Sequence, residues 1–238
     1  MAKKTGKQEK NLSRGTAGTG KFRFPDAFYG LNASSKKFEY LPQPKRLLDD
    51  KVIVIGKFLT EPVTQDLCAS LSQTGVMELF RQRGTKEYAE RLNERFSTDD
   101  VHVAHILWNR LNKCLAQDEY ILKELDFVDA IGLNPQIRAY RYEKGHKFAK
   151  HYDASAKVPG VGTTRWTLLI YLTGGDELVG GDTIFYSSHR GESTAVHPQV
   201  GLALLHKHGD DCLLHEAQEV YKGVKFVLRS DVVFKDMS

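Results

Sequence analysis

Cysteine is scarce in this chain, and long hydrophobic runs are missing. The 238 residues include three cysteines, Cys68, Cys114 and Cys212, an odd number without CxxC spacing, which favours a reducing compartment over a disulfide-stabilised secreted protein. No apolar run approaches the roughly 20 residues that cross a bilayer. The first residues also lack the apolar core of a signal peptide. We therefore expect no membrane-spanning segment and a location in the cytosol or nucleus.

Acidic residues are nearly absent from the first 23 residues. This segment holds seven lysines or arginines and one acid, so it carries +6 while the whole chain carries +4. A segment so basic and so poor in large apolar residues cannot bury enough surface to fold, and we expect a disordered tail over residues 1–23. The tail is either a solubilising leader or an arm for nuclear import or nucleic-acid contact.

The remaining chain has the composition of one soluble domain. Hydrophobic residues make up 41% and charged residues 27% of the chain, and the length suits one sizeable core. Pro42 and Pro44 predict an extended lead-in over residues 24–50. We expect a single domain over residues 51–238, with helical support at 51–130 and a β-rich core at 131–236.

The first half of this domain has the sequence pattern of one strand followed by helices. Residues 51–59 are β-branched and predict a strand, and Pro62 lies near the start of an expected helix at 61–75. Thr98, Asp99 or Asp100 can open a second helix. Apolar residues recur through that second helix at steps of three and four, at Val101, Ala104, Trp108, Leu111 and Leu115.

From about Pro135 onward the texture changes to short β-branched and aromatic runs separated by Gly, Pro and Asp. This pattern is typical of an antiparallel barrel or sandwich. The expected strands lie near residues 136–143, 147–152, 165–172, 182–186, 193–198, 201–206, 212–215 and 224–234. About eight strands suit a jelly roll, or double-stranded β-helix, whose two sheets leave an open mouth. We therefore predict a mainly β fold with supporting α-helices, a jelly roll flanked by N-terminal helices.

His151-Tyr152-Asp153 is the first candidate metal motif. In a strand, residues two apart point to the same side, so His151 and Asp153 can both face the barrel interior. His215 lies far enough along the chain to return on a distant strand and complete the set. Two imidazoles and one carboxylate leave three metal positions open, the arrangement of non-haem Fe(II) oxygenases.

A second HxD sequence, His208-Gly209-Asp210, provides an internal comparison. Its glycine and neighbouring acids indicate a turn rather than a strand end. The only histidine that follows it, His215, is too close to come from a separate distant strand. Context therefore favours the first motif.

The last expected strand, residues 224–234, alternates between two faces. One face holds Phe226, Leu228, Val232 and Phe234, and the other holds Lys225, Val227, Arg229 and Asp231. If the apolar face packs against the helices, Lys225 and Arg229 point into the barrel. A buried cation needs an anion beside it, and a carboxylate ligand would serve.

Several segments resemble one family when they are taken in order. They are RAYRYEKGHKFAKHYD, RWTLLIYLTGG, GGDTIFY, and then His215, Gly223 and Lys225. Over about residues 130–236 the chain resembles the Fe(II)- and 2-oxoglutarate-dependent dioxygenases, specifically the prolyl 4-hydroxylase-like branch. The resemblance implies that His151, Asp153 and His215 bind Fe(II) and that Lys225 holds the distal carboxylate of 2-oxoglutarate. The residues expected near this co-substrate are Tyr142, Thr167, Tyr171 and Arg229.

The resemblance implies an oxidoreductase that consumes dioxygen and 2-oxoglutarate, with L-ascorbate as a candidate reductant. Its simplest substrate is a protein, hydroxylated at prolyl residues. The basic tail leaves a second hypothesis open, oxidation of nucleic acid or of a chromatin- or ribosome-associated protein. A third is a non-catalytic binding module on a decayed oxygenase fold, although the intact ligand set argues against decay.

Overall fold

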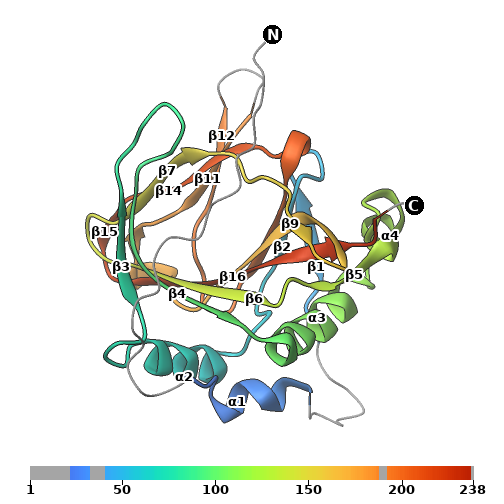
Figure 1. Ribbon diagram of the computed structural model, residues 1–238, viewed down its shortest axis with the longest axis horizontal. Coiled ribbons are helices and arrows are strands. Elements are labelled where there is room, and N and C mark those ends of the chain that lie inside the picture. The colour runs from blue at the N-terminus through green and yellow to red at the C-terminus, as the bar shows by residue number, and fades with distance from the viewer. Residues whose placement is uncertain (1–21, 33–40, 188–191, 237–238) are drawn as a thin grey trace.

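A curled antiparallel sheet dominates the molecule, with α1, α2 and α3 gathered along one side of it (Figure 1). The computed structural model describes residues 22–32, 41–187 and 192–236. The expected fold class, a mainly β jelly roll flanked by N-terminal helices, is confirmed. None of the described helices is long and apolar enough to cross a membrane.

In the described residues, all four α-helices precede residue 130 and most of the strands follow it. The helices are α1 (Asp26–Tyr29), α2 (Glu61–Leu71), α3 (Val101–Leu115) and α4 (Glu119–Glu124). The strands before residue 130 are β1 (Pro44–Leu47), β2 (Val52–Ile55), β3 (Glu78–Gln82) and β4 (Arg91–Asp99). The later strands are β5 (Ala130–Leu133), β6 (Gln136–Tyr142), β7 (Lys147–His151), β8 (Lys157–Val158), β9 (Gly162–Tyr171), β10 (Val179–Gly180), β11 (Thr183–Tyr186), β12 (Ser193–Val196), β13 (Ala203–Lys207), β14 (Leu214–Ala217), β15 (Val220–Lys222) and β16 (Lys225–Phe234).

The strand order places distant segments side by side. In the described residues, one sheet runs β1-β2-β13-β9-β16-β6-β4-β7-β14-β11-β12, with β3, β5 and β8 attached to β4, β16 and β9. The two long strands β9 and β16 lie next to each other at its centre. Toward one end, β7 pairs with β14, which pairs with β11. This end carries the candidate metal ligands.

The two faces of the curled sheet belong to different apolar clusters. The helix-side cluster includes Phe28 of α1, Leu67 of α2 and Leu107 of α3. The interior cluster lies inside the roll and includes Tyr142, Tyr171, Phe185 and Val227. It has a larger share of aromatic residues than the helix-side cluster and borders polar side chains. A buried sheet with one face on helices and one on its own interior needs both faces apolar, which explains the short continuous apolar run over residues 168–171 of β9.

The predicted alternation of β16 is confirmed. Its even-numbered apolar residues, Phe226, Leu228, Val232 and Phe234, lie in the helix-side cluster. Lys225 and Arg229 line a cavity inside the roll instead. The strand period alone therefore located the two inward-facing cations.

The helix predictions are confirmed in position and partly wrong in orientation. Pro62 lies in the first turn of α2, and Asp100 caps α3 by accepting a 2.9 Å hydrogen bond from the amide of Val103. The predicted stripe began at Val101, but Val101 is 71% exposed, and Val103 and Leu107 are buried instead. With the cap at Asp100, the first turn faces solvent and the buried face starts later.

Two parts of the first half differ from the expected texture. Residues between the two helices form the hairpin β3–β4 rather than helix, and β4 pairs with both β6 and β7. The lead-in is also more than an extended connection, because Phe24 and Phe28 are buried and β1 pairs with β2. Most of the predicted tail, residues 1–21, lies outside the described residues.

Candidate metal centre

Two antiparallel strands bring the predicted metal ligands together. His151 ends β7 directly opposite His215 on β14, and the two ring centroids are 4.3 Å apart. Asp153 follows two residues after His151 and is buried, as is His215. One donor atom of each of the three residues lies within 4.8 Å of the other two. A single metal ion can therefore contact all three side chains.

Backbone carbonyls orient both imidazoles in the same way. Nδ1 of His151 lies 2.8 Å from the carbonyl oxygen of Ala149, and Nδ1 of His215 lies 2.9 Å from that of Leu213. Each Nδ1–H can thus donate to a carbonyl, which leaves the Nε2 lone pair free for a metal. Burial lowers the pKa of His151 to about 3 and also lowers the pKa of His215, so both rings are neutral near pH 7.

The carboxylate of Asp153 is ionised and held by two neighbours. Nη2 of Arg229 lies 2.9 Å from its Oδ2, and the Thr167 hydroxyl donates a 2.7 Å hydrogen bond to the same oxygen. Burial is the largest single influence and would raise the pKa of Asp153, but the surrounding charges, Arg229 foremost, together outweigh it and hold the pKa well below its usual range. The other oxygen, Oδ1, lies 3.7 Å from Nε2 of His151, a spacing that suits two ligands of one ion.

This donor set fits Fe(II). Two neutral imidazoles and one carboxylate approach from one side, and the ligating groups already have the protonation states that metal binding requires. The outer contacts to Ala149, Leu213 and Arg229 are of the kind that orient metal ligands.

A buried polar network continues behind Asp153. Nε2 of His208 lies 2.6 Å from the Thr167 hydroxyl oxygen, and Arg229 lies 3.3 Å from Oδ1 of Asp231. Asp231 also pairs with Arg138. His208 belongs to the second HxD sequence, whose Asp210 is exposed. That histidine therefore supports Thr167 rather than pairing with Asp210 around a metal.

The metal ligands and most of the predicted co-substrate residues share one cavity. Its wall includes His151, Asp153, His215, Tyr142, Thr167, Lys225 and Arg229. Tyr171 is fully buried beside this wall, with its hydroxyl oxygen 2.7 Å from that of Thr183. The structure thus brings seven of the eight predicted residues onto one surface and places the eighth next to it.

Lys225 is a buried cation within this cavity. It is 2% exposed, and its Nζ donates a 2.6 Å hydrogen bond to the carbonyl of Gly181. The rings of Tyr142 and Tyr171 lie 5.5 and 5.3 Å from the same nitrogen. Burial lowers the pKa of Lys225 to about 7. A dicarboxylate entering the cavity would supply the anion that this ammonium group needs to stay charged.

The cavity also contains residues that were not predicted from the sequence. Arg91 of β4 stacks between two aromatic rings, its guanidinium 4.4 Å from both Tyr140 and Phe148. His206 of β13 is buried and also lines the wall. Strand alternation within the expected strand 201–206 could have placed His206 inside, since it shares a face with Leu204. Arg91 had no such signal because β4 was not foreseen.

Sequence comparison identifies the same part of the chain. Residues 136–230, from β6 to β16, match the family model of the 2OG-Fe(II) oxygenase superfamily. These residues contain all eight predicted site residues. A search of curated proteins found no match.

Structural comparison finds prolyl hydroxylases. The viral collagen prolyl hydroxylase of Paramecium bursaria Chlorella virus-1, solved as its 2-oxoglutarate complex, is similar with a TM-score of 0.53 at 19% identity, covering 76% of this chain and 95% of that one. A Pseudomonas putida prolyl-4-hydroxylase gives 0.53 at 15% identity, covering 78% and 94%. A Trichoplax adhaerens prolyl hydroxylase, solved with a hypoxia inducible factor peptide fragment, gives 0.54 at 15% identity, covering 77% and 84%. Residues 136–230 are therefore similar to the 2OG-Fe(II) oxygenase superfamily, and the chain has the fold of these solved prolyl hydroxylases.

Proposed function

We propose that the chain is a 2-oxoglutarate-dependent hydroxylase of a protein substrate, most simply of prolyl residues. One observation carries the proposal: the triad of His151, Asp153 and His215 opens onto the same cavity as the buried ammonium group of Lys225. A metal site with an ammonium group beside it suits a dicarboxylate co-substrate that chelates the metal at one end and pairs with the ammonium group at the other. The similar prolyl hydroxylases, one of them solved with a peptide, support a protein substrate.

In this proposal each residue has a defined task. His151, Asp153 and His215 hold Fe(II), and Lys225 pairs with the far carboxylate of 2-oxoglutarate. Tyr142 forms part of the wall against which the co-substrate lies. Thr167 and Arg229 keep the Asp153 carboxylate ionised and oriented. When bound, the iron would couple oxidative decarboxylation of 2-oxoglutarate by dioxygen to the transfer of one oxygen atom to a substrate C–H bond.

The domain division follows the same reasoning. Residues 131–236 would form the catalytic jelly roll and residues 51–130 its support, with 24–50 closing the helix side. The nucleic-acid hypothesis depends on the tail at residues 1–23, most of which lies outside the described residues. That hypothesis stays a prediction, as do the use of L-ascorbate and a cytosolic or nuclear location.

A peptide-oxidation assay tests the proposed function. Purified protein with Fe(II), 2-oxoglutarate and a pool of proline-containing peptides is expected to release succinate and to add the mass of one oxygen atom to particular peptides. Matched pools in which proline is replaced by alanine identify the oxidised residue. Succinate release without any oxidised peptide across all pools would contradict a protein substrate, and no succinate release at all would contradict the enzyme.

Arg229→Met is expected to weaken Fe(II) binding about 10–100-fold, the cost typical of losing an outer partner of a metal ligand. The change removes the cation that lies 2.9 Å from Asp153 and leaves two buried carboxylates, Asp153 and Asp231, with less countercharge. Calorimetric titration with Fe(II) under anaerobic conditions measures the effect. Arg95→Met, at an exposed arginine of β4, is the control. Unchanged metal affinity with weaker 2-oxoglutarate binding would instead make Arg229 a direct partner of the co-substrate.

A further inference from the structure

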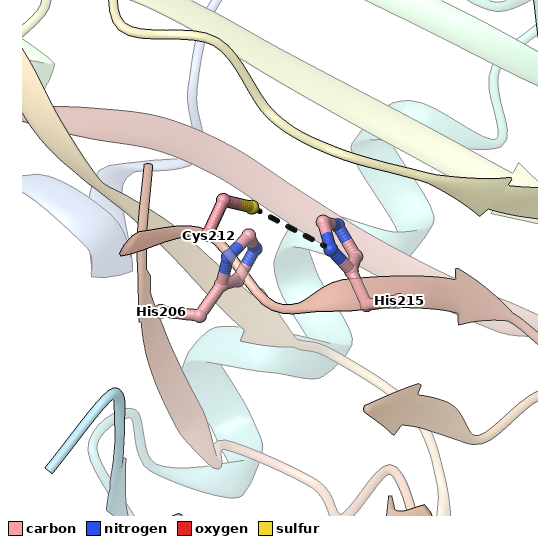
Figure 2. A group of neighbouring side chains, drawn as sticks. All are labelled: His206, Cys212 and His215. Carbon is pink, nitrogen blue, oxygen red and sulfur yellow. Dashed lines mark hydrogen bonds between the residues drawn. The ribbon is translucent and has the colours of Figure 1, made fainter. Parts of the chain in front are cut away.

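A second group of metal-binding side chains lies beside the proposed iron site. His206, Cys212 and His215 are 2%, 7% and 4% exposed, and one donor atom of each lies within 4.8 Å of the others. Figure 2 shows the Cys212 thiol beside the His206 ring and joined by a dashed line to the His215 ring, with His206 on β13 and His215 on β14. The group shares His215 with the proposed iron site. His206 and Cys212 have no role in the proposed reaction.

The distances in this group suit a tetrahedral ion. A sulfur and a nitrogen ligand of one zinc, at about 2.3 and 2.0–2.1 Å from the metal, are about 3.6 Å apart. Sγ of Cys212 lies 3.9 Å from Nδ1 of His215. An ion held by these two atoms requires the ring proton to move from Nδ1 to Nε2 and replaces the 2.9 Å contact of Nδ1 with Leu213. Nε2 of His206 lies 3.7 Å from Oδ2 of Asp153, which offers a fourth donor to the same ion. Small movements of the side chains would therefore close the group around a metal.

The surroundings of these side chains are partly apolar, and their contacts with the backbone include one of 3.4 Å between Sγ of Cys212 and the carbonyl oxygen of Leu213. Nδ1 of His206 lies 3.4 Å from the carbonyl oxygen of Lys207, which is a long contact. The ring of Phe185 lies 5.6 Å from His206 and 5.7 Å from His215 between centroids. An apolar wall of this kind excludes water and strengthens metal–ligand interactions.

The chemistry of the donors selects a different metal from the proposed iron site. A thiolate with two imidazoles is a soft donor set, which prefers Zn²⁺ or a similar thiophilic ion. Two imidazoles and a carboxylate without sulfur suit Fe(II). The general affinity order of divalent ions also places Zn²⁺ above Fe²⁺ for a given set of nitrogen and sulfur ligands.

The two sites compete for one histidine. A neutral imidazole has one free lone pair, so the His215 ring can serve one ion at a time. An ion bound beside Cys212 would also draw on Asp153, whose Oδ2 faces His206. We propose that His206, Cys212 and His215 form an inhibitory site for Zn²⁺ or a similar thiophilic ion, which displaces iron by taking His215. The displacement rests on the proposed iron site, whereas the thiophilic site stands on its own.

Cobalt spectroscopy tests the thiophilic site without any turnover. Anaerobic titration of the full-length protein with Co²⁺ is expected to produce a sulfur-to-cobalt charge-transfer band in the near ultraviolet. The band is expected to disappear in Cys212→Ser and to persist in Cys68→Ser, which removes a half-buried thiol of α2. His206→Gln is expected to weaken cobalt binding at this band. No band in the unmodified protein, or an undiminished band in Cys212→Ser, would overturn the site.

Equilibrium dialysis tests the displacement of iron. Dialysed anaerobically against equal concentrations of Fe²⁺ and Zn²⁺, the unmodified protein is expected to retain zinc and little iron. Cys212→Ser is expected to retain at least about tenfold more iron than the unmodified protein, because losing one contributor to a metal site lowers the affinity for the bound ion by at least about tenfold. Iron and zinc bound together in the unmodified protein would overturn the competition. Melting temperatures of the metal-free variants establish that each variant is folded. A protein that shows the cobalt band but no turnover of 2-oxoglutarate would contradict the proposed function and leave the thiophilic site standing.

Discussion

Asp153→Ala is expected to lower iron-dependent turnover of 2-oxoglutarate by more than about 100-fold, because even the outer partners of metal ligands contribute about 10–100-fold. The change removes the only carboxylate of the proposed ligand set. It also leaves Arg229, which lies 2.9 Å from Oδ2 of Asp153, with its charge facing the metal position. Like charges in a buried site repel strongly, so the loss exceeds that of one ligand bond.

Succinate release and Fe(II) affinity, measured on the same preparation, check this expectation. Asp210→Ala is the matched control, because Asp210 is the carboxylate of the other HxD sequence and is exposed. It is expected to keep full turnover. Asp153→Asn preserves the volume of the side chain and separates a loss of charge from a loss of packing. An Asp153→Ala protein with full turnover and a normal melting temperature would remove Asp153 from the iron site.

The interior of the roll was predictable because strand periodicity is a local property. Once residues 224–234 are taken as a strand, the apolar residues that share a face with Phe226 show which face packs against the helices. Lys225 and Arg229 must then face the interior of the roll. The same rule sends His151 and Asp153 to one side of β7 and its extension. The pairing of His151 with His215 needed only the assumption that a distant strand returns beside the first.

Tertiary pairing was not predictable in the same way. The approach of Arg229 to Asp153 depends on how β16 lies against the end of β7, which no local pattern states. The sequence therefore suggested Arg229 as an anion partner of the co-substrate, whereas its contacts are with Asp153 and Asp231. The hairpin β3–β4 was missed because its strands are rich in charged residues and lack clean apolar alternation.

The neighbourhood of Cys212 was equally out of reach. His206 and His215 flank it on two different strands, and Cys212 itself follows a short turn. A lone cysteine in a sequence carries no metal-binding signal without CxxC spacing. Only the packing of β13 near β14 makes the three side chains a group.

Lys225→Met is expected to weaken 2-oxoglutarate binding about 100-fold, within the range of about 2–5 kcal/mol that losing one partner of a buried charge pair costs. Methionine keeps most of the volume of the lysine stem but removes the ammonium group that would pair with the far carboxylate. Lys222→Met is the matched control, because Lys222 is an exposed lysine on neighbouring β15. Calorimetric titration of the metal-loaded protein with 2-oxoglutarate measures both. Metal affinity is expected to be unchanged in both variants.

The pH dependence of this binding follows from the burial of Lys225. Because burial lowers its pKa to about 7, the free protein loses the ammonium charge as the pH rises above that value. The carboxylate of 2-oxoglutarate binds the charged form of Lys225, so above about pH 7 binding must take up a proton. The affinity for 2-oxoglutarate is therefore expected to fall by up to about tenfold per pH unit, from about pH 7 to the higher pKa that Lys225 has in the complex. Below about pH 7 the lysine is already charged, and its contribution to affinity is constant. Lys225→Met is expected to abolish this decline, and a decline of the same steepness in Lys225→Met would assign it to another group.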